Sequence, residues 1–454
     1  MSKVTQQRGA SSSSPSPFKR WLTSKIMTYL GGEQRLLKVR KRREAKRIKE
    51  GRRHVIEYFH QVDDGYSHLA LQLLEKFKAH YDVEFIIHLV PALRDDNFPE
   101  PELWQEMSRA DAQRIAAHYG LTFNCAESLP PPNLVAKASC ILSHLSTEDF
   151  YTKGLLVSEC LWRCDEAALD NFAEQLGTAS KQQVTHQLDL GSARRKALKH
   201  YSSATFWYEG EWYWGVDRSY HLEQRLISLA AQNQLHDNSI IAPRPEIETN
   251  FPTKANQLTL EFFASLRSPY TAMIWDATFK LAEDSGVKLV VRPVLPMVMR
   301  GVPATLEKGL YLATDVAREA RTVGADYGNF YDPIGTPVLQ AYSLYMWALT
   351  QDKGNELLTA FLKAAFARGI NTNRQSGLRK VVESAGLTWS EAKQHLHDDD
   401  WKDLLEGNRL AMYQFGSWGV PSYRLLDASG QQIMGVWGQD RLWLVAKKIS
   451  ELLD

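Results

Sequence analysis

The chain has 454 residues, of which 44% are hydrophobic, 24% charged and 11% aromatic. This composition excludes a wholly disordered chain, a collagen-like repeat and a low-complexity polymer, and the length allows two to four domains. No apolar stretch reaches the roughly 18–20 residues of a membrane-spanning helix, and the N-terminal segment does not read as a secretory signal, so we expect a cytoplasmic protein.

The net charge of +1 hides a strongly basic N-terminal segment. Residues 1–17 contain a serine run and two prolines and are expected to form a disordered tail. Residues 18–53 contain 14 Lys or Arg against three Glu, with apolar residues at helical spacing, and predict a basic helical arm. Two interpretations stay open: the arm docks on an anionic surface, membrane or nucleic acid, or it packs as a solvated helix on its own acidic body.

An internal repeat follows the arm. Residues 56–87 align with residues 260–291 at an offset of 204 positions, and both segments read as strand, turn, helix and strand. A second block, residues 214–218, aligns with residues 437–441 at an offset of 223. Two blocks in the same order indicate duplication of a whole domain. We therefore expect one domain over residues 54–240 and a second over 257–454, joined by a proline-rich link.

The second copy predicts an α/β fold with a mixed sheet interrupted by a helical insertion. Its opening strand, helix and strand form a right-handed parallel unit. Strands are expected to return at residues 422–426 and 432–436, followed by a closing helix over 439–453. Apolar residues at three- and four-residue spacing predict the inserted helices over residues 306–322, 338–350, 356–367, 375–385 and 390–397.

Ser268, Pro269 and Tyr270 stand where the first predicted strand of the second copy meets its helix. The unpaired N–H groups and the positive dipole end of a helix N-terminus favour an anion, such as a thiolate. Proline suits the first helical turn because its missing N–H has no intrahelical partner there. The alternative is that Ser268 only caps the helix, which needs no ligand.

Three motifs of the second copy carry a family resemblance. They are residues 260–270, residues 416–422 and residues 437–442, with Lys308-Gly309-Leu310-Tyr311 between the first two. Together they resemble the 2-hydroxychromene-2-carboxylate isomerase and kappa-class glutathione transferase branch of the DsbA-like thioredoxin-fold family. The resemblance covers most of residues 258–453 and implies two thioredoxin-like domains, each with a helical insertion in a mixed central sheet.

The resemblance also implies a glutathione site. In this family the serine matching Ser268 activates the sulfur of glutathione, and the proline matching Pro421 is cis, which turns the backbone of Val420 toward the peptide. Lys308 matches the lysine that pairs with a carboxylate of glutathione. The family's asparagine before that lysine has no counterpart here, and Arg300 is the candidate replacement. The remaining implied contacts are Gln439 and Asp440 for glutathione and Tyr270 and Trp418 for the substrate.

Purely structural interpretations of the same residues stay open. Lys308 can be a solvated side chain, Asp440 an N-cap and Trp418 a core residue. All four cysteines lie in the first copy, so the second lacks the two thiols that disulfide exchange requires. We assign no metal site, because no set of metal ligands can be placed. The first copy reads Asp64-Gly65-Tyr66 where the second has Ser268-Pro269-Tyr270, and it has no proline at the cis position, so thiol chemistry is not expected there.

Three functions are compatible with these features. The leading hypothesis is a glutathione-dependent isomerase or transferase acting on a conjugated, aromatic small molecule. The second is a non-catalytic scaffold of two paired thioredoxin folds, recruited to an anionic surface by the basic arm. The third, a protein-disulfide oxidoreductase, conflicts with the missing sulfurs. The sequence does not name the substrate.

Overall fold

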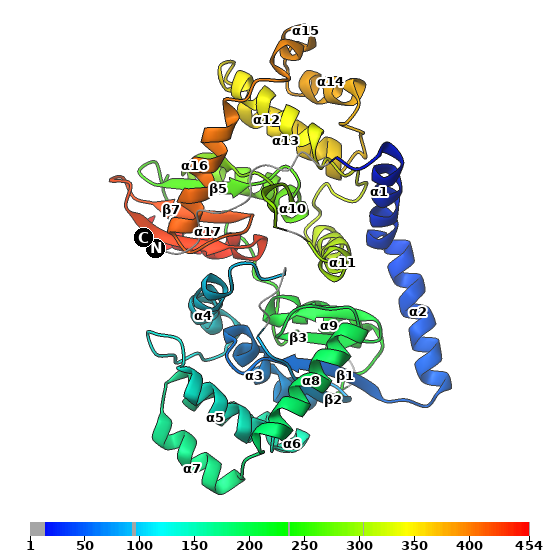
Figure 1. Cartoon of the computed structure of the whole chain (residues 1–454), viewed down its shortest axis with the longest axis vertical. Coiled ribbons are helices and arrows are strands. Elements are labelled where there is room, and N and C mark those ends of the chain that lie inside the picture. Colours follow the sequence, from blue (N-terminus) through cyan, green and yellow to red (C-terminus); the bar gives the residue numbers. More distant parts are fainter. Residues whose placement is uncertain (1–13, 93–96, 235–236, 303, 454) are drawn as a thin grey trace. The chain divides into compact units, whose positions relative to one another are not determined.

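Figure 1 shows the computed structural model of the chain. The structure describes residues 14–92, 97–234, 237–302 and 304–453, so most of the predicted tail lies outside the described residues. The chain divides into two compact units: residues 1–37 with 246–454, and residues 38–245. We call them the C-terminal and N-terminal units and describe each by itself.

A four-stranded mixed sheet, in the order β6-β5-β7-β8, organises the C-terminal unit. Strand β5 (Thr259–Ala264) leads into helix α10 (Pro269–Ser285) and then to β6 (Lys288–Pro293), which pairs parallel to β5. Strand β7 (Ser422–Leu426) returns antiparallel to β5 and pairs with β8 (Gln432–Trp437). Strand β5 is buried on both faces, with Leu260, Phe262 and Phe263 fully buried. The candidate site lies where the chain passes from β5 into α10.

Between β6 and β7 the chain forms the helical insertion. Helix α11 begins and ends at the predicted residues, whereas the helix over residues 401–414 was not predicted. The short helix η5 (Gln439–Arg441) and α17 (Leu442–Leu453) close the unit. The inserted elements are η3 (Met297–Arg300), α11 (Leu306–Thr322), α12 (Thr336–Leu349), α13 (Gly354–Phe366), α14 (Gln375–Ser384), α15 (Trp389–Ala392), η4 (Lys393–His395) and α16 (Trp401–Gln414).

The N-terminal unit has a second four-stranded sheet, in the order β2-β1-β3-β4. Strand β1 (His54–His60) leads through α3 (Gly65–His80) to the parallel strand β2 (Val83–Leu89). Strands β3 (Thr205–Tyr208) and β4 (Glu211–Trp214) complete the sheet before α9 (Gly215–Ser228). The insertion of this unit comprises α4 (Pro101–Ala116), η2 (Ala117–Tyr119), α5 (Pro132–Leu142), α6 (Thr147–Trp162), α7 (Glu166–Leu176) and α8 (Lys181–Ala197).

The two sheets share their strand order and their register. Val55 pairs with Glu84 in one sheet, and Thr259 pairs with Lys288 in the other, both shifted by the same 204 positions. Each sheet is mixed and is interrupted by helices between its second and third strands. The predicted α/β class, with a helical insertion in each mixed sheet, is confirmed.

The basic arm forms two helices, α1 (Pro17–Gly31) and α2 (Glu33–Lys49). Helix α1 packs on α11 within the C-terminal unit, and the boundary between the units falls inside α2, after Leu37. In the N-terminal unit Arg40 makes two 2.8 Å hydrogen bonds to Glu211, so this part of the arm packs on an acidic side chain of the chain itself. Among the described residues, no helix combines the length and apolarity needed to cross a membrane.

Candidate functional site

Ser268 caps the N-terminus of α10. Its Oγ accepts a hydrogen bond from the N–H of Thr271 at 3.1 Å, and Pro269 occupies the first helical turn. The same Oγ lies 3.4 Å from the carbonyl oxygen of Val420, to which it donates. Ser268 as a whole residue is partly exposed. Ser268 is therefore the N-cap of α10, and its hydroxyl proton points to the loop that carries Pro421.

The Val420-Pro421 peptide is cis, as the resemblance implies. Hydrogen bonds hold this loop on both sides. The N–H of Gly438 donates to the carbonyl oxygen of Pro421 at 2.9 Å, and the Ser422 hydroxyl donates to the carbonyl oxygen of Gly419 at 2.7 Å. The backbone beside Ser268 is thus fixed by bonds that do not involve a ligand.

Trp418 and Lys308 meet on one side of this loop. The Trp418 side chain is buried, and its ring stacks on that of Trp437 with centroids 5.9 Å apart. The Lys308 ammonium lies 5.7 Å from the centre of the Trp418 ring, within cation–π range. Trp418 Nε1 has no hydrogen-bond partner within the described part of the chain. Trp418 is therefore a core residue that keeps an unused donor next to a cation.

Gln439 and Asp440 lie in η5, the short helix that directly precedes α17, where the sequence predicts the start of a single closing helix. Gln439 is buried, and its Nε2 donates to Asp440 Oδ1 and, at 3.4 Å, to Glu319 Oε2. Its Oε1 is buried and accepts no hydrogen bond from any described residue. The two residues thus contact each other, and η5 packs against α10, whose N-terminus carries Ser268.

Two residues for which the sequence predicts ligand contacts, Tyr270 and Arg300, form hydrogen bonds to other parts of the protein. The Tyr270 hydroxyl donates to Asp315 Oδ2 on α11 at 2.7 Å, and its ring packs with a cluster that includes Met273. Tyr270 therefore joins α10 to α11. Arg300 is buried, which lowers its pKa, and its Nε donates to the carbonyl oxygen of Leu295 at 3.0 Å, so it already serves the protein backbone.

Sequence reasoning missed an ion pair behind Ser268. Arg267, the preceding residue, makes bonds of 2.9 and 3.0 Å to the carboxylate of Asp332. Burial opposes the ionisation of Asp332, but the positive charge and hydrogen bonds of Arg267 outweigh it and lower the pKa of the carboxyl group. The sequence shows the charge of Arg267, but no local pattern in it indicates a partner 65 residues later.

The N-terminal unit places Asp64 at the corresponding helix N-terminus. Asp64 Oδ2 accepts hydrogen bonds from the N–H of Ser67 at 3.1 Å and from the Ser203 hydroxyl at 3.1 Å. The carboxyl group is almost fully buried, and burial raises its pKa to about 6. This helix N-terminus therefore already holds an anion of the protein itself.

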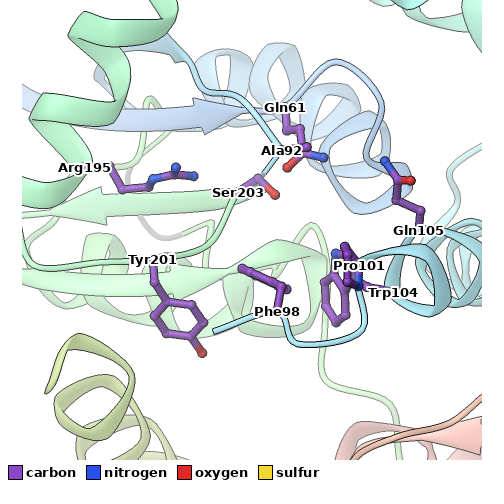
Figure 2. Close-up of a pocket in the computed structure, with 9 residues that line it drawn as sticks. All are labelled: Gln61, Ala92, Phe98, Pro101, Trp104, Gln105, Arg195, Tyr201 and Ser203. Atoms are coloured by element: carbon purple, nitrogen blue, oxygen red, sulfur yellow. The ribbon is translucent and has the colours of Figure 1, made fainter. Parts of the chain in front are cut away.

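A pocket of the N-terminal unit lies beside Ser203 (Figure 2). Asp63 accepts hydrogen bonds of 3.0 Å from the side-chain amides of Gln61 and Gln105, which fixes two polar groups of the wall. Sequence reasoning did not predict this pocket, since its wall comes from separate elements without a shared motif. The lining residues are Gln61, Ala92, Phe98, Pro101, Trp104, Gln105, Arg195, Tyr201 and Ser203.

A strand leading into a capped helix, with a cis proline loop facing the cap, defines the C-terminal unit as a thioredoxin-fold unit. Residues 259–450 match the DSBA-like thioredoxin domain family, so this region is a DsbA-like thioredoxin domain. A comparison with curated proteins gave no match.

Solved structures of low sequence identity are similar to part of the chain. A 2-hydroxychromene-2-carboxylate isomerase shares 19% identity over 43% of this chain and 95% of its own, with a TM-score of 0.36. A probable DsbA oxidoreductase from Streptomyces coelicolor shares 18% over 42% and 89%, with a TM-score of 0.33. The disulfide oxidoreductase DsbA from Proteus mirabilis shares 13% over 47% and 97%, with a TM-score of 0.25.

Proposed function

We propose that the DsbA-like domain is a glutathione-dependent isomerase or transferase that acts on a conjugated aromatic small molecule. One observation carries the proposal. A serine hydroxyl at the N-terminus of α10 faces Val420 in a domain that contains no cysteine. The domain therefore needs a sulfur from outside itself for thiol chemistry, and a helix N-terminus favours that sulfur as an anion.

Ser268 supplies the proton that orients this sulfur. As a cap its oxygen accepts from Thr271, and its single O–H donor is left to bond elsewhere. The 3.4 Å separation from the Val420 oxygen is long for a hydroxyl hydrogen bond. The proton can thus turn from Val420 to a ligand atom beside it at small cost, while the cap stays intact.

The remaining residues bind and orient glutathione. The buried acceptor Gln439 Oε1, which has no hydrogen-bond partner among the described residues, suits a peptide with donors of its own, while Trp418 and Tyr270 contact the aromatic substrate. Lys308 pairs with a carboxylate, and Asp440 pairs with the amino group. Bound glutathione supplies a sulfur nucleophile for a conjugated carbon, which gives isomerisation where the sulfur departs and conjugation where it stays.

Titration of the full chain with reduced glutathione tests the proposal. Calorimetry should show binding at millimolar concentrations or below, together with a rise in thermal stability. Absence of both heat and thermal shift at millimolar ligand would overturn it. An insulin-reduction assay should give no activity, because the domain has no dithiol.

The cytoplasm, with its glutathione pool, is the compartment in which we propose that the protein works.

We propose that the N-terminal unit is a duplicated domain without thiol chemistry that acts as a scaffold or binding domain. Asp64 supports this, because its carboxylate occupies the position where a thiolate would have to be stabilised, and two anions there repel. The shared register of the two sheets supports duplication. Loss of glutathione binding on changing Asp64 to Ala, with Ser268 intact, would contradict this division of roles.

A further inference from the structure

Helix α1 has the opposite arrangement to an ordinary surface helix. Its polar side packs on the C-terminal unit through hydrogen bonds: Arg20 donates to the Asp332 carbonyl oxygen at 2.6 Å, and Ser24 Oγ accepts from the Asp332 N–H at 3.0 Å. Thr28 Oγ1 accepts from the Phe330 N–H at 3.0 Å. These contacts hold the helix in one rotation about its axis.

The apolar side of α1 faces outward. Positions 18, 22, 26 and 29 recur at three- or four-residue spacing and therefore lie along one face, with position 21 beside them. A cluster of this size on a fixed helix marks an interaction site, unlike a scattered exposed leucine. The side chains, here called the α1 stripe, are Phe18 (69% exposed), Trp21 (46%), Leu22 (40%), Ile26 (47%) and Tyr29 (66%).

Cations lie on and just after the helix that carries the α1 stripe. Lys19 and Lys25 are exposed on the same helix, and the Arg35 guanidinium lies 5.6 Å from the centre of the Tyr29 ring. Residues 14–49 contain only two acidic residues, Glu33 and Glu44. Further exposed cations follow on the part of α2 that belongs to the N-terminal unit: Lys38, Lys41, Arg42, Arg43, Lys46 and Lys49.

We propose that the α1 stripe docks on an anionic phospholipid surface. Apolar and aromatic side chains on one face, with lysines and arginines around them, are the composition of helices that lie in a membrane interface. The cations then contact the acidic headgroups. A symmetric pairing of two copies through this face would bring the same positive charges together, which disfavours a second copy as the occupant.

Vesicle flotation of the full chain tests this docking. The protein should float with phosphatidylcholine vesicles that contain about 30% phosphatidylserine, and much less with phosphatidylcholine alone. Raising the salt from about 0.1 M to about 1 M should weaken binding. Leu22→Ser with Ile26→Ser should lower vesicle affinity at least about tenfold. The matched control is Leu156→Ser with Leu190→Ser, which removes two other exposed leucines and should leave binding unchanged.

Several outcomes would overturn the proposal. These are no flotation with either vesicle, equal loss in both double variants, or a dimer in size-exclusion chromatography that the α1 variant dissociates. Capture on double-stranded DNA that the α1 variant leaves intact, with no vesicle binding, would assign the cations to nucleic acid instead. Unchanged thermal unfolding of both double variants serves as the folding control.

Discussion

The hydroxyl oxygen of Ser268 lies 3.4 Å from the carbonyl oxygen of Val420, although 152 residues separate the two in the chain. The contact joins the N-terminus of α10 to the cis proline loop. Thr271 uses the same oxygen as its cap acceptor. The Ser268 oxygen therefore has a structural role as the acceptor that caps α10. Its O–H group has a separate role, because it can donate to Val420 or to another acceptor.

Ser268→Ala should separate these roles when compared with a second serine cap. We expect the variant to lose about 0.5–2 kcal/mol of stability as a helix cap and about 100-fold in turnover with glutathione. Ser146, which caps α6 by accepting from Asp149 N at 3.1 Å, is the control. Ser146→Ala should lose similar stability and no turnover. Equal turnover in both variants would leave Ser268 with the cap role alone.

Lys308→Met should lower the affinity for glutathione about tenfold, because it removes the positive charge that we propose pairs with a carboxylate of the peptide. Methionine keeps apolar contact with the Trp418 ring, over which the lysine ammonium lies at 5.7 Å. Lys280→Met, on an exposed face of α10, is the control and should bind glutathione normally. Calorimetry measures both affinities, and an unchanged affinity in the first variant would contradict the assigned role.

Much of the fold could be predicted because its signals are local or repeated. The offset of 204 aligned Tyr66 with Tyr270, and the structure shows their hydroxyls 2.7 Å from Asp111 and Asp315, which are also 204 residues apart. The unpredicted helix α16 has a different reason. Its buried face includes the polar residues Asn408 and Arg409, which break the apolar periodicity on which the prediction relied.

The site could be predicted only in part. The N-terminus of α10 and the loop with Pro421 each carry a sequence motif. Their tertiary partners do not: Arg267 finds Asp332 across 65 residues, and the wall of the pocket in Figure 2 is assembled from separate elements. Such pairings depend on packing in three dimensions, which spacing along the chain does not encode.

Asp64→Asn should change the pH dependence of unfolding. Burial raises the pKa of Asp64 from 3.8 to about 6, so the folded state holds this proton more tightly than the unfolded state. Stability therefore falls as pH rises from about 4 to about 6, and the full cost, about 3 kcal/mol, is present above that range. Relative to the parent chain, the variant should gain about that much between pH 4 and pH 8 in urea unfolding.

Ser180→Ala is the control for this pH effect. Ser180 caps α8 in the same unit and accepts from Gln183 N at 3.3 Å, but it carries no titratable group. Its loss of stability should be the same at both pH values. A difference between Asp64→Asn and the parent that stays constant with pH would mean that folding does not change the pKa of this carboxyl group.

Asp332→Asn should loosen both Arg267 and helix α1. The Asp332 carboxylate binds Arg267 and also attracts the buried Arg20 guanidinium, which donates to the Asp332 carbonyl oxygen, so its charge supports both the back of the candidate site and the arm. Loss of a buried charge partner should cost about 3 kcal/mol. Tryptic cleavage within α1 should become faster, because opening of the helix becomes easier.

The exposed pair of Asp326 and Arg368 provides the matched control, since it is also bidentate, with both bonds at 2.6 Å. Solvent and salt screen an exposed pair, so Asp326→Asn should cost less than about 1 kcal/mol and leave cleavage within α1 unchanged. The comparison holds the chemical change constant and varies only burial. If both variants lost the same stability, burial would not be what makes the Asp332 pair strong. If cleavage within α1 also stayed unchanged in Asp332→Asn, the packing of α1 on α11 would be what holds the helix.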